Sequence, residues 1–403
     1  MSGAIAALAA AQEGISVEIF EEHSDIGEPS HCSGHVGIQA FRRFAPAIPE
    51  RIIENEIKGA VLYSPNGQSL ILHRREPVTW VLNRAELDRH LASAATKSGA
   101  KLNLKSRVES LRRHDAGFGL RISGPDRSEI TCRMVIEAGG CGASVSKYTG
   151  PTKATNGILV NSAQFNVGNL RDIDRDFVEV YFGQNYAPGF FGWIIPRRDG
   201  TAKVGIAAGA RANVRECLKR FTSKHPVVSE KLKHSKPLTA PIYHPIPVGG
   251  ATRRTYADGI LTVGDAASQV KPTTGGGIVF GLACGRLAGK TAAITIRTGD
   301  TSATNLASYE RAWRQLIGFD LRAMSWLRRL MYRLPDQHLD RIFKVSADLK
   351  ADEILDRTSD IDFQGRGLLS LARDPRLFIT LLSASLLSVP SLLAQEARAR
   401  RRS

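Results

Sequence analysis

The residues best suited to chemistry lie in one segment near position 265. An apolar run, residues 260–263, ends in Gly264 and Asp265, and three glycines at 275–277 then open a second apolar stretch at Ile278. Glycines at a helix start let the backbone approach a planar ring or a phosphate, and the first amides of the helix favour negative charge there. The aspartate is placed to hold a sugar or linker hydroxyl. The pattern predicts a nucleotide-binding strand and helix, with Gly264, Asp265, Gly276, Gly277 and Ile278 at the cofactor; an ordinary strand, loop and helix is the alternative.

The start of the chain has the pattern of the second half of a dinucleotide-binding βαβ unit. Residues 3–13 form an alanine-rich helical pattern and residues 16–20 a strand, which ends at Glu21. A carboxylate at this position accepts ribose hydroxyls. Only Gly3, after Ser2, remains of the glycine motif that should precede the helix, and we expect both residues at the cofactor. We therefore expect the sequence to begin about a dozen residues late, with Met1 inside that motif; a true fragment that binds its cofactor poorly is the alternative.

The remaining elements are predicted from hydrophobic periodicity. A strand at 78–82 leads into an amphipathic helix at 84–97, and a buried strand covers 133–138. The region 159–208 alternates in the manner of strands and is rich in aromatic residues, which indicates a separate β-rich domain. The chain becomes helical after residue 308. A β-meander is expected from three further runs, 102–104, 107–111 and 119–123.

Composition and charge limit the class of protein. The chain has 403 residues, of which 42% are hydrophobic, so it can bury a large core in two or more units. A formal charge of +16 suggests an anionic partner, which charge alone leaves open among a phosphorylated substrate, a lipid surface and nucleic acid. The five cysteines show neither a CxxC pair nor zinc-ligand spacing, so we expect no structural metal and a reducing cytosol.

The segment 377–394 near the C-terminus is apolar but contains several serines, a threonine and Pro390. A membrane-spanning helix needs roughly 20 cleanly apolar residues, so we expect a surface-seeking or core helix. Arg398 and the arginines at 400–402 follow it and would suit anionic lipid headgroups. A docked helix with a solvated basic tail explains the pattern equally well.

Several of these segments together resemble the geranylgeranyl reductase family of flavoproteins, most closely the branch that acts on archaeal membrane lipids. Glu21 matches the ribose-binding acid of the family, and residues 27–34 are similar to its Pro-x-x-Cys-x-Gly segment beside the flavin. Residues 181–183 and 187–196 resemble the motif that lines the isoprenoid channel, and residues 264–278 resemble its second flavin motif. The first and last of these segments are shared with many flavin monooxygenases, whereas the other two make the assignment specific.

The resemblance implies an α/β fold with a Rossmann-like FAD-binding domain of the para-hydroxybenzoate hydroxylase type, whose first strand is missing here. It also implies a β-rich substrate domain and a helical C-terminal region. The expected boundaries are 1–58, 80–150 and 255–300 for the discontinuous FAD domain, 59–79 and 151–254 for the substrate domain, and 301–403 for the helical region.

The resemblance further implies that reduced FAD delivers hydride to isolated double bonds of geranylgeranyl chains in archaeal-type lipid precursors. Such an alkene also needs a proton at its other carbon. Cys32 is the first candidate donor, ahead of His31 and an ordered water. The family positions further place Cys32, Ser33, Arg84 and Val108 at the cofactor, with Arg84 at the FAD phosphates or ribose and the backbone of Val108 near the adenine.

The channel motif implies a set of residues that line the isoprenoid substrate: Tyr181, Phe182, Pro188, Gly189, Phe191 and Trp193. Phe190 and Phe191 replace a glycine and a tyrosine of the family motif, so chain-length preference is expected to differ. The Asp-Gly that usually follows the 135–136 strand is Gly139-Gly140 here.

Other functions compatible with the cofactor motifs are a flavin monooxygenase or halogenase, and a reductase of chlorophyll-precursor or menaquinone tails. A flavin-free lipid- or membrane-binding protein is the non-enzyme alternative. The partners expected of the reductase are an isoprenoid lipid with an anionic headgroup and an external electron donor that the sequence does not identify. We expect no nucleic acid partner and no metal, and a cytoplasmic location with possible peripheral contact at the inner membrane face.

Overall fold

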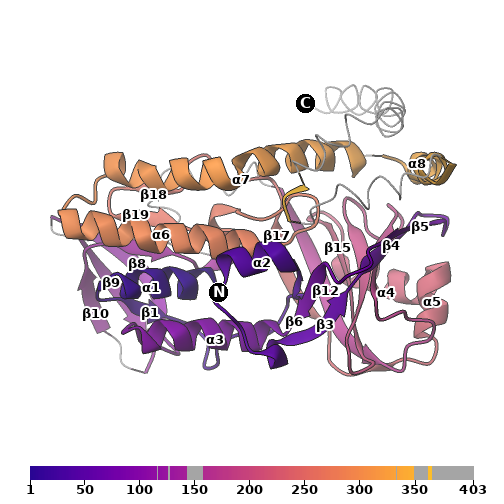
Figure 1. Cartoon of the computed structure of the whole chain (residues 1–403), viewed down its shortest axis with the longest axis horizontal. Coiled ribbons are helices and arrows are strands. Elements are labelled where there is room, and N and C mark those ends of the chain that lie inside the picture. The colour runs from indigo at the N-terminus through magenta and orange to yellow at the C-terminus, as the bar shows by residue number, and fades with distance from the viewer. Residues whose placement is uncertain (116, 126–127, 143–157, 333, 349–361, 365–403) are drawn as a thin grey trace. The chain divides into compact units, whose positions relative to one another are not determined.

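The computed structural model describes the chain except residues 116, 126–127, 143–157, 333, 349–361 and 365–403 (Figure 1). The chain divides into two compact units. Unit 1 comprises residues 1–53, 82–158 and 246–321, and unit 2 comprises residues 54–81, 159–245 and 322–403. Unit 1 holds most of the predicted FAD domain, and unit 2 holds most of the predicted substrate domain.

The helices of unit 1 pack closely because small residues line their contacts. Helices α1 (Ser2–Gln12), α3 (Arg84–Lys97) and α6 (Ile278–Thr298) lie side by side, with α1 between the other two (Figure 1). A Cβ atom on Gly289 of α6 would lie 2.2 Å from the carbonyl oxygen of Ala6, and one on Gly285 would lie 2.5 Å from that of Ser2. Alanine would clash at either position, so these glycines allow the backbones of α1 and α6 to approach. The short helix α2 (Ile38–Phe44) also packs against α6.

Helix α6 is also the one helix of the described residues that is long and apolar enough to span a membrane. Of its most apolar window, 72% is buried inside the protein. Burial of this extent is typical of a core helix, which needs apolar residues on most of its surface.

The strands of unit 1 form three small sheets. Strand β1 (Glu18–Phe20) pairs in parallel with β7 (Lys101–Asn103), and β11 (Val135–Glu137) pairs in parallel with β19 (Ile260–Thr262). Strand β18 (Tyr256–Ala257) adds to β19 in antiparallel orientation. No strand among the described residues joins the β1–β7 pair to the β11–β19 pair. The observed meander consists of β8 (Arg107–His114), β9 (Gly117–Ser123) and β10 (Ser128–Cys132). The predicted runs 107–111 and 119–123 lie in it, whereas the run 102–104 overlaps β7, which pairs with β1 instead.

Unit 2 is built on one mixed sheet that follows the predicted alternating pattern. Its order is β16-β12-β15-β14-β13-β4-β5, and β17 also pairs with β12. The helices α4 (Val214–Lys224) and α5 (Pro226–Leu232) pack together, and α4 covers β12 and β15. Strands β3 (Ile53–Ile57) and β6 (Thr79–Leu82) are neighbours in a separate three-stranded sheet. The bounds of the large sheet are β4 (Gly59–Tyr63), β5 (Ser69–His73), β12 (Leu159–Gly168), β13 (Phe177–Phe182), β14 (Phe191–Pro196), β15 (Ala202–Gly209), β16 (Lys236–Pro237) and β17 (Ile242–Pro247).

The predicted helical region does not form a third unit. Helix α7 (Ala303–Met331) begins in unit 1 and ends in unit 2, and α8 (Asp336–Asp348) belongs to unit 2. The apolar segment 377–394 and the arginines after it lie outside the described residues.

Candidate cofactor and substrate sites

The glycine-rich segment of unit 1 forms a tight turn ahead of α6. Strand β19 is fully buried and leads into a 3-10 turn, η5 (Gly264–Ala267), in which Gly264 has a φ of +66°. Helix α6 begins after Gly277, which has no side chain that could cap its first amides. The helix start therefore offers backbone N–H groups and a positive dipole end to an anionic group.

Asp265 lies directly against this helix start. A Cβ atom on Gly277 would lie 3.1 Å from Asp265 Oδ1, and one on Gly276 would lie 2.5 Å from Cε of the buried Lys271. Because they lack side chains, Gly277 leaves room for the Asp265 carboxylate and Gly276 leaves room for the Lys271 side chain. Burial raises the pKa of Asp265 above its ordinary value, and the charges of Arg84 and His31 oppose that shift only in part. The predicted residues Gly276, Gly277, Ile278 and Asp265 therefore meet in one place.

Arg84 brings a positive charge to the same site. Asn83 Oδ1 accepts the backbone N–H of Glu86 at 3.1 Å, which caps α3 and fixes Arg84 as its first residue. The guanidinium donates to both carboxylate oxygens of Asp88, at 2.7 and 3.0 Å. Burial lowers the pKa of Arg84, and Asp88 and Cys32 together raise it by more, so the group stays charged. Its Nε is buried without a hydrogen-bond partner in the described structure, which leaves one donor for a ligand oxygen.

Cys32 and its neighbours come from the loop before β2 (His35–Gly37). The Cys32 side chain lies within hydrogen-bonding reach of Arg84, and its Sγ accepts the N–H of Gly34 at 3.4 Å. The side chain of Ser33 accepts the N–H of His35 at 3.5 Å. The thiol of Cys32, the imidazole of His31 and the guanidinium of Arg84 are thus gathered near Asp265.

The start of α1 packs against the turn. Ser2 Oγ lies 2.6 Å from the position of a Cβ on Gly264 and 2.5 Å from that of a Cβ on Gly281. Gly3 lies against Ala138, whose Cβ would be 3.1 Å from a Cβ on Gly3. Ser2 and Gly3 are therefore placed beside the Gly264 turn, and alanine at position 264 would force Ser2 to move.

Glu21 and Val108 lie at a second part of the predicted cofactor site. The carboxylate Oε1 of Glu21 accepts the backbone N–H of His23 at 3.0 Å and lies 2.6 Å from His23 Nδ1, whereas Oε2 has no partner among the described residues. The backbone oxygen of Glu21 accepts the N–H of Ser106 at 2.8 Å, which brings the β8 edge beside it. Val108 stands at an irregularity of the β8–β9 pairing. A ribose hydroxyl could donate to the open oxygen of Glu21.

Two residues of this site were missed by the sequence analysis. Burial, and then the charge of Asp265, raises the pKa of the Cys141 thiol to about 12, so this thiol stays protonated at neutral pH. Lys271 is buried beside Gly276. The only signal for Cys141 was its place after the glycine turn at 139–140, and for Lys271 its place in the loop before the glycines.

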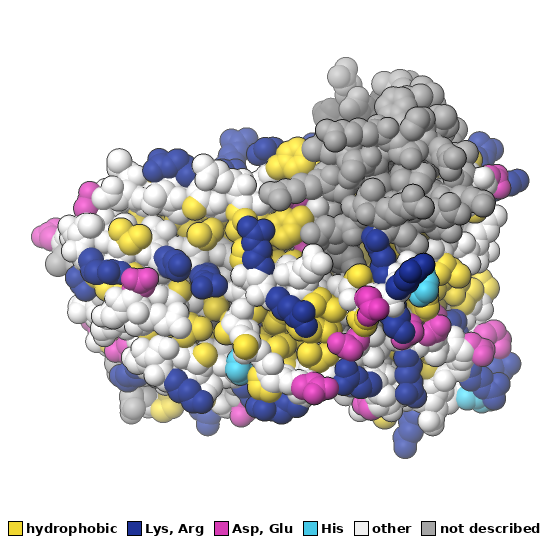
Figure 2. Space-filling view, viewed as in Figure 1, with side chains coloured by type: hydrophobic (Ala, Val, Ile, Leu, Met, Phe, Trp, Pro, Cys, Tyr) yellow, Lys and Arg dark blue, Asp and Glu magenta, His cyan; other side chains and the backbone are white. Residues whose placement is uncertain are grey.

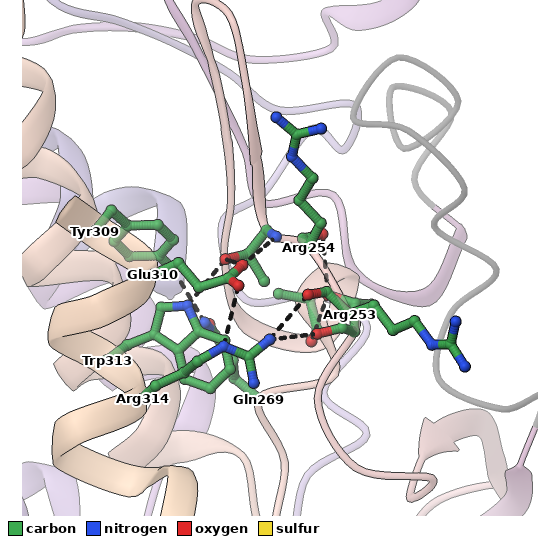
Figure 3. Close-up of polar contacts among 10 residues, drawn as sticks. Arg253, Arg254, Gln269, Tyr309, Glu310, Trp313 and Arg314 are labelled. Atoms are coloured by element: carbon green, nitrogen blue, oxygen red, sulfur yellow. Dashed lines mark hydrogen bonds and ion pairs between the residues drawn. The ribbon is translucent and has the colours of Figure 1, made fainter. Parts of the chain in front are cut away.

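A hydrogen-bond network of uncharged side chains, Gln269 and Tyr309, supports the Gly264 turn (Figure 3). Gln269 Oε1 accepts the backbone N–H of Gly264 at 2.8 Å, and its Nε2 donates to the hydroxyl of Tyr309 at 3.0 Å. Tyr309 in turn donates to the carbonyl oxygen of Thr262 at 3.1 Å. Gln269 and Tyr309 are fully buried, so the network ties α7 to both ends of the turn.

The same helix anchors the preceding loop. The carboxylate of Glu310 accepts the backbone N–H and the hydroxyl of Thr255 at 2.8 and 3.0 Å, and Trp313 donates to that hydroxyl at 2.9 Å. Arg314 donates to Glu310 and to the carbonyl oxygen of Arg253. In Figure 3 the side chain of Arg253 points away from these contacts. Helix α7 therefore holds the segment 252–269 through both backbone and side-chain groups.

Most of the predicted substrate residues lie together in unit 2. Phe182 and Phe191 are cross-strand partners on β13 and β14, with ring centroids 6.1 Å apart, and Trp193 lies 6.0 Å from Phe191. These three side chains are partly exposed. Phe190 stacks on Phe191 at 4.4 Å and is buried. Phe182, Phe191 and Trp193 therefore form a partly exposed surface on one side of the sheet, which we call the aromatic face. Its rings offer an apolar ligand a surface to pack against.

The turn before β14 is fixed by residues near the end of α7. Arg328 donates to the carbonyl oxygen of Gly189 at 2.9 Å, and its guanidinium lies 5.2 Å from the centroid of the Phe190 ring. Gln184 accepts the N–H of Gly189 at 3.0 Å. Pro188 and Gly189 thus have a defined conformation, with Gly189 at a φ of +76°.

Tyr181 differs from the other predicted substrate residues. Successive side chains of a strand point to opposite faces, so Tyr181 faces α4 and α5 while Phe182 faces the other side. Tyr181 is 2% exposed and donates its hydroxyl to Glu179. Glu179 also accepts Lys231 at 2.5 Å, and Lys231 donates to the carbonyl oxygen of Asp172 at 2.9 Å. In this structure the Tyr181 hydroxyl belongs to a buried charged network.

Comparisons with known proteins find relatives of this chain. A sequence model of the family described as "Geranylgeranyl reductase catalytic domain" matches residues 159–240, which include all the predicted substrate residues. The chain is similar to a digeranylgeranylglycerophospholipid reductase of Methanocaldococcus jannaschii, with 30% identity over 343 residues, 84% of this chain and 86% of that protein. A protein with the same description from Methanothrix thermoacetophila is 31% identical over 351 residues, which cover 84% of this chain and 87% of the relative.

Solved structures confirm the predicted fold class. A geranylgeranyl bacteriochlorophyll reductase-like protein from Thermoplasma acidophilum superposes with a TM-score of 0.82 at 24% identity, covering 95% of this chain and 96% of the other. The halogenase PltM in complex with phloroglucinol and FAD has a TM-score of 0.68 at 14% identity, covering 100% and 91% of the two chains. At these identities the likeness concerns the fold alone.

Proposed function

We propose, from the premise that the chain belongs to the geranylgeranyl reductase family, that it uses FAD to reduce the double bonds of geranylgeranyl chains on a glycerophospholipid. The observation that carries the proposal is the identity of 30–31% to digeranylgeranylglycerophospholipid reductases over 84% of the chain. The match covers 84% of the chain, which is more than either unit alone, so it includes residues of both units.

The residues of unit 1 fit a flavin dinucleotide. The uncapped start of α6 and the side chains of Lys271 and Arg84 suit negative charge. Asp265 is placed for a hydroxyl of the linker, and the open oxygen of Glu21 for a ribose hydroxyl. When bound, the reduced flavin supplies the hydride for the reaction.

The chain must supply the proton and the environment. A trisubstituted alkene has no carbonyl to take up charge, so a proton must reach its second carbon as hydride arrives at the first. We assign this role to the Cys32 thiol. The neighbouring Arg84 would stabilise the thiolate that remains after transfer.

The aromatic face of unit 2 would hold the hydrocarbon. Burial of a methylene group contributes about 0.8 kcal/mol, so a long isoprenoid chain gains most of its affinity from apolar contact. Phe182, Phe191 and Trp193 supply rings for that contact. The positive net charge of +16 suits a phosphate headgroup.

We place the reaction in the cytoplasm, with the lipid substrate presented at the inner face of the membrane. The five cysteines are all free thiols, which is the state that a reducing cytosol maintains. An external electron donor would reduce the flavin before each turnover.

The test is an anaerobic incubation of dithionite-reduced, FAD-loaded protein with digeranylgeranylglyceryl phosphate. We expect the lipid to gain the mass of two hydrogens for each reduced bond, and we expect no gain with the oxidised protein. Substitution C32A should slow reduction about a hundredfold or more while dithionite still bleaches the flavin, and C32S should recover part of the rate. Flavin bleaching without any mass gain in the lipid would refute the proposed substrate.

A further inference from the structure

Helix α7 carries one face that is buried and one that is exposed. The residues at 306, 309, 313, 317, 321 and 324 are buried, with exposures of 0–3%. The opposite side holds two large exposed hydrophobic side chains, Phe319 at 40% and Trp326 at 58%. Scattered single hydrophobic residues on a surface need no explanation, but these two are seven residues apart and so lie on the same side of the helix.

Basic residues lie on the same side of α7 as Phe319 and Trp326. At about 100° per residue, positions 311, 315, 319, 322, 326 and 329 fall within an arc of about 80°. These are Arg311, Gln315, Phe319, Arg322, Trp326 and Arg329, all of them exposed, and we call them the α7 face. Figure 2 shows basic and hydrophobic side chains next to one another along the upper edge of the view, where α7 runs.

The acidic side chains of α7 do not share this face. Glu310 is bound to Thr255 and Arg314, and Asp320 is 1% exposed. The exposed residues of the helix therefore include arginines and no carboxylate. A helix face that combines aromatic rings with arginines has the composition of helices that lie in the interface of an anionic membrane. There the rings enter the boundary between headgroups and acyl chains, and the guanidinium groups bind the phosphates.

We propose that the α7 face docks the protein on an anionic phospholipid bilayer, with Phe319 and Trp326 inserted and Arg311, Arg322 and Arg329 bound to lipid phosphates. The charge complementarity selects this occupant over a neutral protein surface. The docking goes beyond the reductase activity, since it concerns how the protein meets the membrane, whether or not the bound lipid is reduced.

The experiment measures sedimentation of the FAD-loaded full chain with vesicles of phosphatidylglycerol and phosphatidylcholine. We expect binding at low salt that weakens at high salt and in vesicles of phosphatidylcholine alone. The F319A/W326A variant should bind at least about tenfold more weakly. The R311Q/R322Q/R329Q variant should lose about a hundredfold at low salt, because each basic residue near an anionic surface contributes about a factor of five.

A charge-matched control distinguishes vesicle binding through the α7 face from attraction of the whole positively charged protein to the anionic vesicle. Lys97 on α3 and Lys219 and Lys224 on α4 are exposed, and K97Q/K219Q/K224Q removes the same charge outside α7. We expect this control to bind almost as well as the native protein. Equal losses in the control and the arginine variant would overturn the proposal, as would a native protein that does not bind anionic vesicles.

Trp326 provides a second measurement that does not depend on a multiple variant. Lipids with brominated acyl chains should quench part of the tryptophan fluorescence of the native protein, and W326F should bind vesicles but lose that quenching. A quenching unchanged by W326F would contradict insertion of Trp326. If F319A/W326A instead splits a dimer in sedimentation velocity and leaves vesicle binding unchanged, the face joins two copies of the chain and the membrane proposal is wrong. Unchanged flavin absorbance in each variant reports that it has folded.

Discussion

A buried polar network in unit 1 and another in unit 2 are built differently. In unit 1, Gln269 and Tyr309 are neutral and bond to each other and to the backbone of Gly264 and Thr262. In unit 2, Glu179 and Lys231 are charged and bond to each other between β13 and α5. A neutral network can position a backbone at little desolvation cost, whereas a buried ion pair is strongly destabilising once one partner is lost. We therefore expect changes in unit 1 to affect cofactor affinity and changes in unit 2 to affect stability.

The largest effect is expected from K231M, which leaves the buried Glu179 without its cationic partner. Unit 2 should lose about 3–5 kcal/mol of stability, measured by hydrogen exchange in peptides from β13 and α5. The double variant K231M/E179Q should recover part of that loss, because the remaining amide oxygen can still accept the Tyr181 hydroxyl.

Lys233 offers a matched control for this change. It pairs with Glu230 at 3.6 Å, and both side chains are exposed, at 59% and 73%. An exposed pair contributes about 0–1 kcal/mol, so K233M should leave exchange nearly unchanged. If K231M behaves like K233M, the buried pair does not stabilise unit 2.

The next effect concerns the turn in unit 1. G264A places a β-carbon on a residue with a φ of +66° and 2.6 Å from Ser2 Oγ. Left-handed backbone alone costs about 1–2 kcal/mol, and displacement of Ser2 adds to it. We expect FAD affinity, measured by quenching of flavin fluorescence, to fall at least about tenfold.

Gly299 separates the two causes. It has a φ of +76°, and no atom from elsewhere in the chain lies within 4 Å of the place that a β-carbon would take, so G299A carries the backbone cost alone. FAD affinity should then stay near that of the native protein. An equal loss in both variants would show that general destabilisation, rather than the turn itself, weakens cofactor binding.

A smaller effect is expected from Q269L, which removes the acceptor of the Gly264 N–H. An unsatisfied buried donor costs about 1–3 kcal/mol, and here the cost should appear as weaker FAD binding with little change in hydrogen exchange of unit 2. Q315L, at an exposed position of α7, serves as the control. Loss of stability in unit 2 without loss of FAD affinity would reverse the contrast between the networks.

The smallest effect concerns acid stability of unit 2. Burial lowers the pKa of His225 to about 4, below the ordinary value of about 6.5. The unfolded state therefore binds more protons between these values, and stability should fall as pH drops through this range, by about 1 kcal/mol near pH 5.5.

H225N tests this assignment, because asparagine does not titrate and is a good N-cap. His225 caps α5 by accepting the N–H of Val228 at 3.4 Å, and asparagine can replace that bond. Hydrogen exchange in α5 should depend less on pH in the variant. An identical pH dependence in both proteins would assign the acid sensitivity to other groups.

Local patterns in the sequence were sufficient for most of the elements. Helix α3 begins at residue 84 and ends at 97 as predicted, since Asn83 is a local cap and the apolar periodicity is regular. Strands β8 and β9 of the meander and the strands β12–β15 were also expected, whereas β10 was not. The helical region after residue 300 was expected to be separate, but α7 shares its buried face with unit 1 because Tyr309 and Trp313 bond to the cofactor-side loop.

The candidate cofactor site was predicted in part. The glycines and Asp265 could be recognised because they are adjacent in the chain, and Arg84 and Cys32 through the family resemblance. Cys141 and Lys271 carried no distinctive spacing. Tyr181 was grouped with Phe182 because the two are neighbours in the motif, although a strand turns them to opposite faces.

The sequence alone determined where helices and strands begin, which segment can approach a nucleotide, and which family the motifs resemble, because these properties depend on residues close together in the chain. Only the tertiary structure decided the partners of Arg84, the support of Gly264 by Gln269 and Tyr309, and the pairing of Glu179 with Lys231. The physical reason is that a buried polar group must find its partner in three dimensions, and residues such as Glu179 and Lys231, 52 positions apart, meet only after the sheet and its helices have packed.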